Sequence, residues 1–484
     1  MPDREPTLYW CEWAMAASEP DFSQPDFSQS GPTQSDPVDQ PSAAAAAPGV
    51  LLEVAGGRIA SVRTGTEPPP GAERLSGLVL YGFANAHSHA FHRALRGRTG
   101  EYGGSFWSWR RLMYAAAERL TPDSYRELAA AVYAEMALAG VTCVGEFHYL
   151  HHAPGGRRYA DPNAMGAALV AAAADAGIRI TLLDTLYLAG GLGADGRHTP
   201  PEGVQLRFAD ADLDAWADRA ASFRPEGGHA RAGAAAHSVR AVPADALAGF
   251  ADLYRESTIE WPSPHIHLSE QPAENEACRA AYGRTPAAHL AEAGLFTDVH
   301  PVLVHATHLD PADVRLLRER RADICLCPTT ERDLADGLPP LAELGMDRVT
   351  LSLGSDGHST IDMLAEARAA EMHERLRTGR RGTVPALMLL DALHENGHAG
   401  ALGWHDAGWI GEGKRADLVV LDMDGVRTAG FDPAQAAEAA VFAATGAEVR
   451  HVMADGRWIV RDRVHTAMPD APARLDAAIG RLLG

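Results

Sequence analysis

The chain has 484 residues, with 64 acidic residues against 43 lysines and arginines, so its formal net charge is −21. This charge argues against nucleic acid or an anionic membrane as a partner, and no apolar run approaches the ~18 residues of a spanning helix. The N-terminus lacks a secretory signal pattern, and five cysteines are typical of a reducing compartment, so we expect a cytoplasmic protein without disulfides.

Both ends of the chain carry short apolar runs that resemble strands. These runs are residues 7–13, 51–54, 58–62, 416–421 and 450–460. Gly56-Gly57 and Asp455-Gly456 are predicted hairpin turns between such runs. We expect a small β-sandwich domain built from both chain ends. Its predicted segments are 1–15, 49–82 and 403–484, the last with a terminal helix.

Residues 16–48 have the composition of a disordered, low-complexity insertion. The pentapeptide at 20–24 repeats at 25–29, and a Ser/Pro/Asp-rich stretch and an alanine run follow. Such a segment buries too little apolar surface to offset the entropy of ordering. We expect a tolerated loop insertion, with a recognition motif as the alternative.

In the middle of the chain, apolar runs of strand length alternate with helix-like stretches. The runs are 78–83, 141–147, 178–186, 232–236, 265–268, 302–305, 324–327 and 349–354. Helix-like stretches include 121–139, 163–176, 243–254 and 362–377, and Thr121-Pro122 and Asp161-Pro162 resemble N-caps. This α/β alternation predicts a (β/α)₈ TIM-like barrel over 83–402, with a doubly wound open sheet as the alternative. The barrel is favoured because nearly every run ends in His, Asp or Glu, and a barrel gathers strand ends around one mouth.

The ends of three predicted strands carry potential metal ligands. His87 and His89 form an HxH pattern, and alternation along a strand turns both imidazoles to one side. His267 lies on the fifth strand and Asp356 follows the eighth. Any one of these histidines alone is more often a structural residue, but the ordered set predicts a Zn²⁺ site, with Fe²⁺ or Mn²⁺ as alternatives.

Two further polar residues complete the predicted catalytic set. Glu270, three residues after His267, can reach a water activated by the metal and is the predicted general acid/base. His305, at the end of the sixth strand, is predicted to orient this water or to stabilise the intermediate. We expect Asp356 to accept a proton in addition to binding the metal.

Other residues that could carry chemistry are few. Lys414 is the only lysine, which argues against lysine-dependent catalysis and against two metals bridged by a modified lysine. Cys325 and Cys327 alternate on the predicted seventh strand and are interpreted as buried free thiols, with a second zinc site as the alternative.

These motifs resemble the amidohydrolase superfamily and, within it, the branch of formimidoylglutamate deiminases. The resemblance covers nearly the whole chain apart from 16–48. It rests on the segments 87–91 (HSHAF), 105–110 (SFWSWR), 145–152 (GEFHYLHH), 236–242 (AHSVRAV), 265–271 (HIHLSEQ), 305–308 (HATH), 327–331 (CPTTE) and 354–356 (GSD).

The resemblance implies a cytoplasmic homodimer that uses a single Zn²⁺. The implied reaction is hydrolysis of N-formimino-L-glutamate to N-formyl-L-glutamate and ammonia, in histidine degradation. It also assigns Arg110 and Arg240 to the two substrate carboxylates, which arginine pairs with bidentately. Tyr149 and His237 would add hydrogen bonds to the substrate.

The sequence departs from that branch at two pocket positions. His92 stands where the family usually has glutamine, and Gly357 stands where it usually has serine. His92 can still hydrogen-bond a carboxylate, whereas Gly357 offers only its backbone N–H.

Two functional alternatives therefore stay open. One is another deaminase of the superfamily acting on a purine, pyrimidine or triazine ring; the other is a non-catalytic scaffold, although such relatives normally lose metal ligands.

Overall fold

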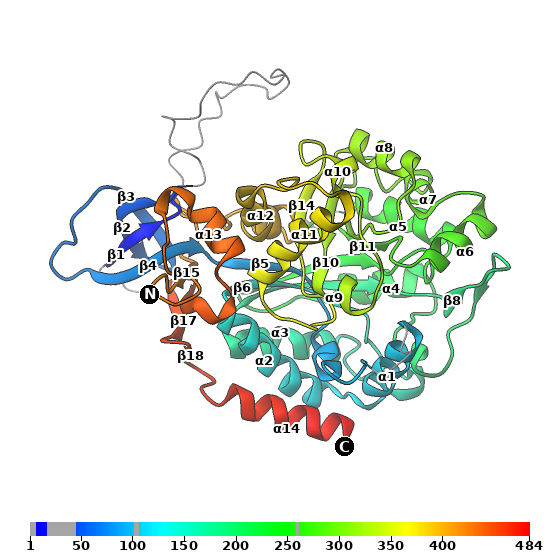
Figure 1. The fold of residues 1–484 in the computed structure, drawn as a ribbon. Coiled ribbons are helices and arrows are strands. Elements are labelled where there is room, and N and C mark those ends of the chain that lie inside the picture. Colours follow the sequence, from blue (N-terminus) through cyan, green and yellow to red (C-terminus); the bar gives the residue numbers. More distant parts are fainter. Residues whose placement is uncertain (1–5, 17–44, 101–105, 258–260) are drawn as a thin grey trace.

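The computed structural model describes residues 6–16, 45–100, 106–257 and 261–484 (Figure 1). The predicted insertion, apart from 16 and 45–48, lies outside the described residues. Within the described ranges, no helix combines the length and the apolar composition needed to cross a bilayer.

A parallel sheet of eight strands forms the centre of the molecule. The strands are β5 (Phe83–Ser88), β6 (Val141–His148), β7 (Arg179–Leu186), β10 (Ala230–Ala236), β11 (His265–Leu268), β12 (Val302–His305), β13 (Asp323–Leu326) and β14 (Thr350–Leu353). They pair in chain order from β5 to β14, and a parallel bridge between Ser88 and Asp356 joins the two outermost strands. The predicted (β/α)₈ barrel is therefore confirmed.

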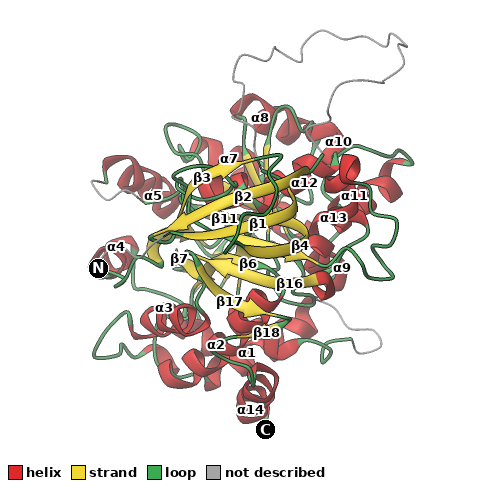
Figure 2. Ribbon diagram, turned by 90° about the vertical axis from the view of Figure 1, so that its left-hand side faces the viewer, coloured by secondary structure: helices red, strands yellow, loops and turns green. Residues whose placement is uncertain are grey.

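Helices surround the strands (Figure 2). They are α1 (Phe106–Arg119), α2 (Pro122–Leu138), α3 (Ala164–Ala176), α4 (Leu213–Ser222), α5 (Ala244–Glu256), α6 (Pro272–Tyr282), α7 (Pro286–Glu292), α8 (Pro311–Arg320), α9 (Pro328–Asp333), α10 (Leu341–Leu344), α11 (Met363–Thr378), α12 (Ala386–Leu393), α13 (Ala436–Phe442) and α14 (Ala471–Leu483). Short 3₁₀ turns are η1 (Ala90–Leu95), η2 (Pro154–Gly156), η3 (Gly203–Arg207), η5 (Pro433–Gln435) and η6 (Gly446–Glu448), and η4 (Asn396–Ala401) is a π-helical turn.

The two predicted N-caps have different outcomes. Thr121 caps α2 in a capping box with Ser124. The second prediction is wrong: α3 begins after Asn163, and Asp161 instead accepts a hydrogen bond from the Asn163 backbone N–H at 2.9 Å. The Asp161 side chain therefore closes a turn in front of the helix.

Strands from both chain ends form a second sheet beside the barrel (Figure 1). They are β1 (Thr7–Ala14), β2 (Ala47–Ala55), β3 (Arg58–Arg63), β4 (Glu73–Tyr81), β15 (Leu418–Leu421), β16 (Val449–Ala454), β17 (Arg457–Arg461) and β18 (Val464–His465). Their order is β18-β17-β16-β15-β4-β1-β2-β3. The two ends meet where β4 pairs antiparallel with β15. The prediction of a small β-domain built from both ends is confirmed. A two-stranded ribbon, β8 (Gly191–Leu192) with β9 (His198–Thr199), completes the sheets.

One strand boundary was predicted wrongly. The apolar run 78–83 was expected to be the first barrel strand, but residues 78–81 end β4 of the second sheet, and the barrel begins at Phe83. Gly82 separates the two strands. A Cβ there would lie 2.4 Å from the Thr142 hydroxyl, so this crossing accepts only glycine.

Buried side chains reinforce the junction of β5 and β14. The Asn85 amide donates to the Ser355 hydroxyl at 2.6 Å and accepts the Ser355 backbone N–H at 2.9 Å. The Ser355 hydroxyl also contacts His358, whose second ring nitrogen lies 3.2 Å from the Ser88 hydroxyl. A chain of hydrogen bonds thus links the first barrel strand to the segment after the last one.

We expect Asn85→Ala to destabilise the fold by about 2–4 kcal/mol, because it leaves the buried Ser355 N–H without a partner and removes one hydrogen bond from the Ser355 hydroxyl. Urea unfolding followed by circular dichroism measures this change. Asn396→Ala is the matched control, since Asn396 makes no side-chain hydrogen bond to the described residues, and its effect should stay below about 0.5 kcal/mol. Equal effects of the two substitutions would contradict the role of Asn85.

Glu366 of α11 supports the same region from outside the barrel. Its carboxyl group accepts the Thr329 backbone N–H at 2.9 Å and the Thr329 hydroxyl at 2.5 Å. The next residue, Thr330, donates to the Ser355 carbonyl at 3.2 Å and accepts the Gly357 N–H at 3.0 Å. Burial raises the pKa of Glu366 to about 8.

The raised pKa predicts a stability that depends on pH. Between the ordinary value of 4.5 and about 8, the folded chain holds a proton at Glu366 that the unfolded chain has released, so stability falls as pH rises through this window. From about pH 6 to about pH 8, wild type should lose about 2 kcal/mol more than Glu366→Gln in urea unfolding. The exposed Glu319→Gln variant should keep the wild-type slope, and a wild-type slope in Glu366→Gln would refute the prediction.

Candidate metal centre and substrate pocket

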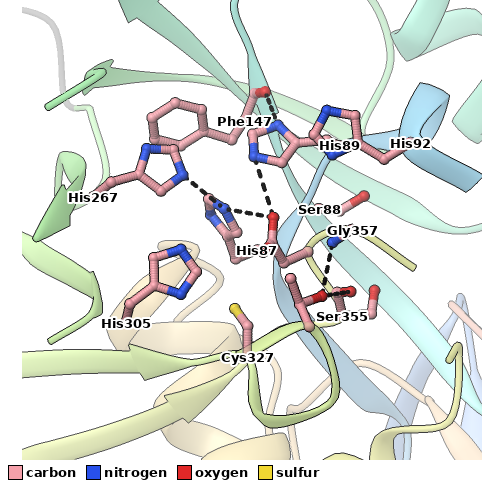
Figure 3. A network of polar contacts seen from close by, with 12 residues as sticks. His87, Ser88, His89, His92, Phe147, His267, His305, Cys327, Ser355 and Gly357 are labelled. Carbon is pink, nitrogen blue, oxygen red and sulfur yellow. Dashed lines mark hydrogen bonds and ion pairs between the residues drawn. The ribbon is translucent and has the colours of Figure 1, made fainter. Parts of the chain in front are cut away.

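The four predicted metal ligands meet at the barrel mouth, and Figure 3 shows His87, His89 and His267 close together there. The Nε2 atoms of His87 and His267 lie 3.2 Å apart. The Asp356 Oδ1 atom is 3.6 Å from His87 Nε2 and 3.4 Å from His89 Nε2. Ligand atoms of the three histidines all lie within 4.8 Å of one another. Strands β5 and β11 and the segment after β14 thus deliver all four side chains to one point.

Hydrogen bonds to the backbone orient two of these imidazoles. His89 Nδ1 lies 2.9 Å from the Phe147 carbonyl, and His267 Nδ1 lies 2.9 Å from the His237 carbonyl. A carbonyl only accepts, so Nδ1 carries the hydrogen and Nε2 keeps its lone pair toward the centre. Metal-binding histidines are held in the same way.

Burial keeps the imidazoles neutral. It lowers the pKa of His89 to about 3 and lowers the pKa values of His87 and His267 well below the ordinary value. His87 Nε2 lies 3.2 Å from the lone pair of His267 Nε2, and the buried Nδ1 of His87 has no hydrogen-bond partner among the described residues. The donor set therefore fits a divalent metal of the zinc type.

The backbone is strained at the strand ends that carry these groups. His305, Ala306 and Asp356 have φ angles of 74°, 52° and 42°, in a region that non-glycine residues rarely occupy. Such strain persists only where surrounding contacts enforce it, and it is typical of functional sites.

Glu270 lies beside an arginine and an imidazole. Its Oε2 atom accepts Arg240 Nη2 at 2.6 Å, and its Oε1 atom is 4.0 Å from His305 Nε2. Burial alone would raise the pKa of Glu270, but Arg240, His305 and His267 lower it to about 2. Arg240 also lies 3.4 Å from Glu274.

His305 is held by a carboxylate that sequence reasoning did not assign. Its Nδ1 atom is 3.4 Å from Glu331 Oε1. Although burial disfavours the charged form, Glu331, Glu270 and Asp356 raise the pKa of His305 to about 10. Glu331 was visible only as part of the segment 327–331, because nothing in its spacing links it to His305.

Every predicted site residue except His87 lines one pocket. Its empty volume is about 1060 Å³ including the open mouth. The predicted residues in its lining are His89, His92, Arg110, Tyr149, His237, Arg240, His267, Glu270, His305 and Asp356. His87 is fully buried beneath them. The pocket thus brings the predicted metal ligands and both predicted carboxylate-binding arginines into one space.

Aromatic and acidic residues that the sequence did not single out complete the wall. They are Tyr114, Tyr187, Phe208 and Glu274. Arg110 Nε donates to the Tyr114 hydroxyl at 2.7 Å, and the guanidinium lies 5.0 Å from that ring's centroid. Tyr187 directly follows β7, and this position after a barrel strand is the signal that could have identified it.

The two departures from the deiminase branch both find local partners. His92 Nε2 lies 3.0 Å from the Tyr149 hydroxyl. Gly357 donates its N–H to Thr330, and a Cβ at Gly357 would be in ordinary contact, 3.4 Å from Thr330. Steric fit therefore does not require glycine at 357.

The cysteines are free and buried, as predicted. His148 is the last residue of β6, and His151 and His152 follow it. None of the three lines the pocket: His151 Nε2 contacts the Thr185 carbonyl at 3.0 Å, and His152 Nε2 is 3.2 Å from Asp210. These three histidines support the loop from behind.

Comparisons with known proteins agree with the predicted family. The chain is 37% identical over 431 residues to formimidoylglutamate deiminase of Pseudomonas aeruginosa, which covers 85% of this chain and 91% of that protein. It is 29% identical over 390 residues to 8-oxoguanine deaminase of the same species, covering 80% of this chain and 82% of that protein.

Solved structures have the same architecture. An amidohydrolase from Brucella melitensis has a TM-score of 0.84 at 30% identity, covering 99% of this chain and 100% of that one. An adenosine deaminase from Xanthomonas campestris with bound zinc has a TM-score of 0.77 at 22% identity, covering 100% and 99%, and shares the fold. The model of the Amidohydrolase family matches residues 78–459, which is more than half of the chain. The chain therefore belongs to the amidohydrolase family of hydrolytic enzymes.

Proposed function

We propose that this amidohydrolase hydrolyses N-formimino-L-glutamate to N-formyl-L-glutamate and ammonia, with one Zn²⁺ per subunit. The observation that carries the proposal is a pocket lined by Arg110 and Arg240 and by the predicted metal ligands. In a chain of net charge −21, two arginines in one cavity suit a substrate with two carboxylates. The similarity to formimidoylglutamate deiminase supports the same substrate.

The metal would be held by His87, His89, His267 and Asp356. When bound, such a metal supplies an activated water at neutral pH and polarises the atom under attack. Fe²⁺ and Mn²⁺ are compatible with the same ligands.

Glu270 is the proton carrier in this proposal. Its carboxylate faces the pocket beside the predicted ligands, so it can take the proton of the attacking water and deliver it to the imino nitrogen, which leaves as ammonia. His305 is held by Glu331 and faces the Glu270 oxygen that Arg240 does not contact. Its positive charge would stabilise the negative charge that develops on the substrate during attack. Asp356 or Glu270 would pass the second proton of the water to the same nitrogen, so that ammonia leaves as the carbonyl group forms.

Arg240 would have two functions. Its Nη2 and Nε atoms face Glu270 and Glu274, so the guanidinium positions the proton carrier. Its fork has five N–H donors, and those directed away from the glutamates remain for a substrate carboxylate. Arg110, Tyr149 and His237 would bind the other polar groups of the substrate, and His92 would orient Tyr149.

We further propose that the enzyme acts as a homodimer in the cytoplasm, in histidine degradation.

Kinetics with formiminoglutamate test the assigned residues. Glu270→Gln should lower kcat by about 10²–10⁴-fold with little change in KM, because a proton transfer is lost. Arg240→Ala should raise KM by about 10–100-fold, with a smaller loss in kcat through Glu270. The exposed Glu276→Gln and Arg279→Ala variants on α6 are matched controls and should behave like wild type.

Product analysis by mass spectrometry separates this reaction from its rivals. N-formylglutamate and ammonia are expected, and formamide with glutamate would indicate a different hydrolase. Guanine, 8-oxoguanine, cytosine and adenosine should be poor substrates. A ring base preferred over formiminoglutamate, or wild-type kinetics in both site variants, would overturn the proposal.

Removal of the metal provides an independent test. Dialysis against a chelator should abolish deimination, and Zn²⁺ should restore it, with Fe²⁺ and Mn²⁺ tested in parallel. His267→Ala should fail to retain metal in elemental analysis, whereas His451→Ala, a change in the second sheet, should retain it. A metal-free protein with full activity would disprove the metal dependence, and a wild-type protein that never takes up metal would favour a scaffold.

A further inference from the structure

We propose that Cys327, His305 and Asp356 form a second metal site, next to the four-ligand site, that binds a thiol-seeking divalent cation such as Zn²⁺ or Co²⁺. Filling this site would inhibit the enzyme. The binding is independent of the proposed function, whereas the inhibition rests on it.

The donor atoms of this second set are already assembled. The sulfur, one imidazole nitrogen and one carboxylate oxygen all lie within 4.8 Å of one another, and all three residues are buried. Figure 3 shows the Cys327 sulfur directed toward the space beside His305 and beneath His87. A cation equidistant from atoms at that limit would lie about 0.5–0.8 Å beyond normal zinc–ligand bond lengths, so small side-chain rotations complete the site.

Glu331 fixes two of the three donors. The same Oε1 atom accepts the Cys327 backbone N–H at 2.9 Å and lies 3.4 Å from His305 Nδ1. With Nδ1 directed to Glu331, Nε2 of His305 is the free donor. A carboxylate behind a histidine is the usual outer support of a protein metal ligand. The second set therefore resembles the first, in which carbonyl groups hold His89 and His267.

Access to the two sets is also alike. His305 and Asp356 line the pocket, as do His89 and His267, while Cys327 and His87 are each the fully buried ligand of their set. A cation that enters the pocket can therefore reach either set. The third group of possible ligands among the described residues, His89, His92 and Asp356, shares two members with the first set and is not a separate site.

Donor chemistry decides which cations bind here. A thiolate with one imidazole and one carboxylate suits Zn²⁺, Co²⁺ and Cd²⁺ and disfavours Mg²⁺ or Ca²⁺. On binding, the S–H bond of Cys327 breaks, a sulfur–metal bond forms and the thiol proton passes to solvent; where His305 is protonated, its Nε2 proton is released as well. No electron is transferred. A second cation removes His305 from charge stabilisation and makes Asp356 bridge two metals, which is why activity should fall.

Titration of the metal-free protein with Co²⁺ tests the site directly. Elemental analysis gives the stoichiometry, and a near-ultraviolet thiolate-to-cobalt charge-transfer band reports sulfur ligation. Wild type should bind a first equivalent without the band and a second with it. Cys327→Ser should lose the second equivalent or bind it at least about tenfold more weakly, without the band. Cys325→Ser is the matched control: this thiol lies two residues earlier, is equally buried and belongs to no ligand group of the described residues.

Each result decides the proposal. Saturation at one cobalt without a charge-transfer band in wild type would overturn it, as would a band that persists in Cys327→Ser. If Cys327→Ser does not fold, Cys327→Ala and the wild-type titration give the same decision, because the band itself requires a thiolate. Excess Zn²⁺ should inhibit wild type and Cys325→Ser at least about tenfold more strongly than Cys327→Ser, each relative to its own activity. A protein that binds the second cobalt yet never deiminates formiminoglutamate would keep this site and refute the proposed function.

Discussion

The closure of the barrel between β5 and β14 is the constraint on which the site depends. Asp356 donates its N–H to the His87 carbonyl at 2.9 Å, and His89 donates its N–H to the Asp356 carbonyl at 3.2 Å. The same backbone hydrogen bonds that join the outermost strands place a carboxylate beside two imidazoles. Moving His87, His89 or Asp356 would therefore break backbone hydrogen bonds that close the barrel.

Buried charge is the second constraint. The chain is strongly acidic, and buried carboxylates lie in and behind the pocket. Two of them face a cationic side chain: Glu270 contacts Arg240, and Glu331 contacts His305. Unpaired charges in such a place would cost several kcal/mol each. The pairing also fixes the orientation of these side chains before any substrate binds.

Much of the fold and of the candidate site was predictable because it depends on local spacing. HxH on one strand and a glutamate three residues past His267 are patterns that periodicity interprets directly. Side-chain partners that join distant segments were not predictable. Arg240 was expected to bind substrate, and only the structure revealed its contact with Glu270. The contacts of Glu331 and His358 were not predicted, for the same reason. The run 78–83 was expected to be one barrel strand because only Gly82 separates the end of β4 from the start of β5.

By itself, the sequence determined the alternation of strands and helices, the ligand types and their order along the chain, since these follow from residue chemistry and from periods of two and 3.6 residues. Only the tertiary structure decided that β5 meets β14, that one oxygen of Glu331 serves both His305 and Cys327, and that ten predicted site residues face one cavity. The physical reason is that strand closure and side-chain pairing join residues far apart in the chain, and no local pattern records which of the many compatible partners come into contact.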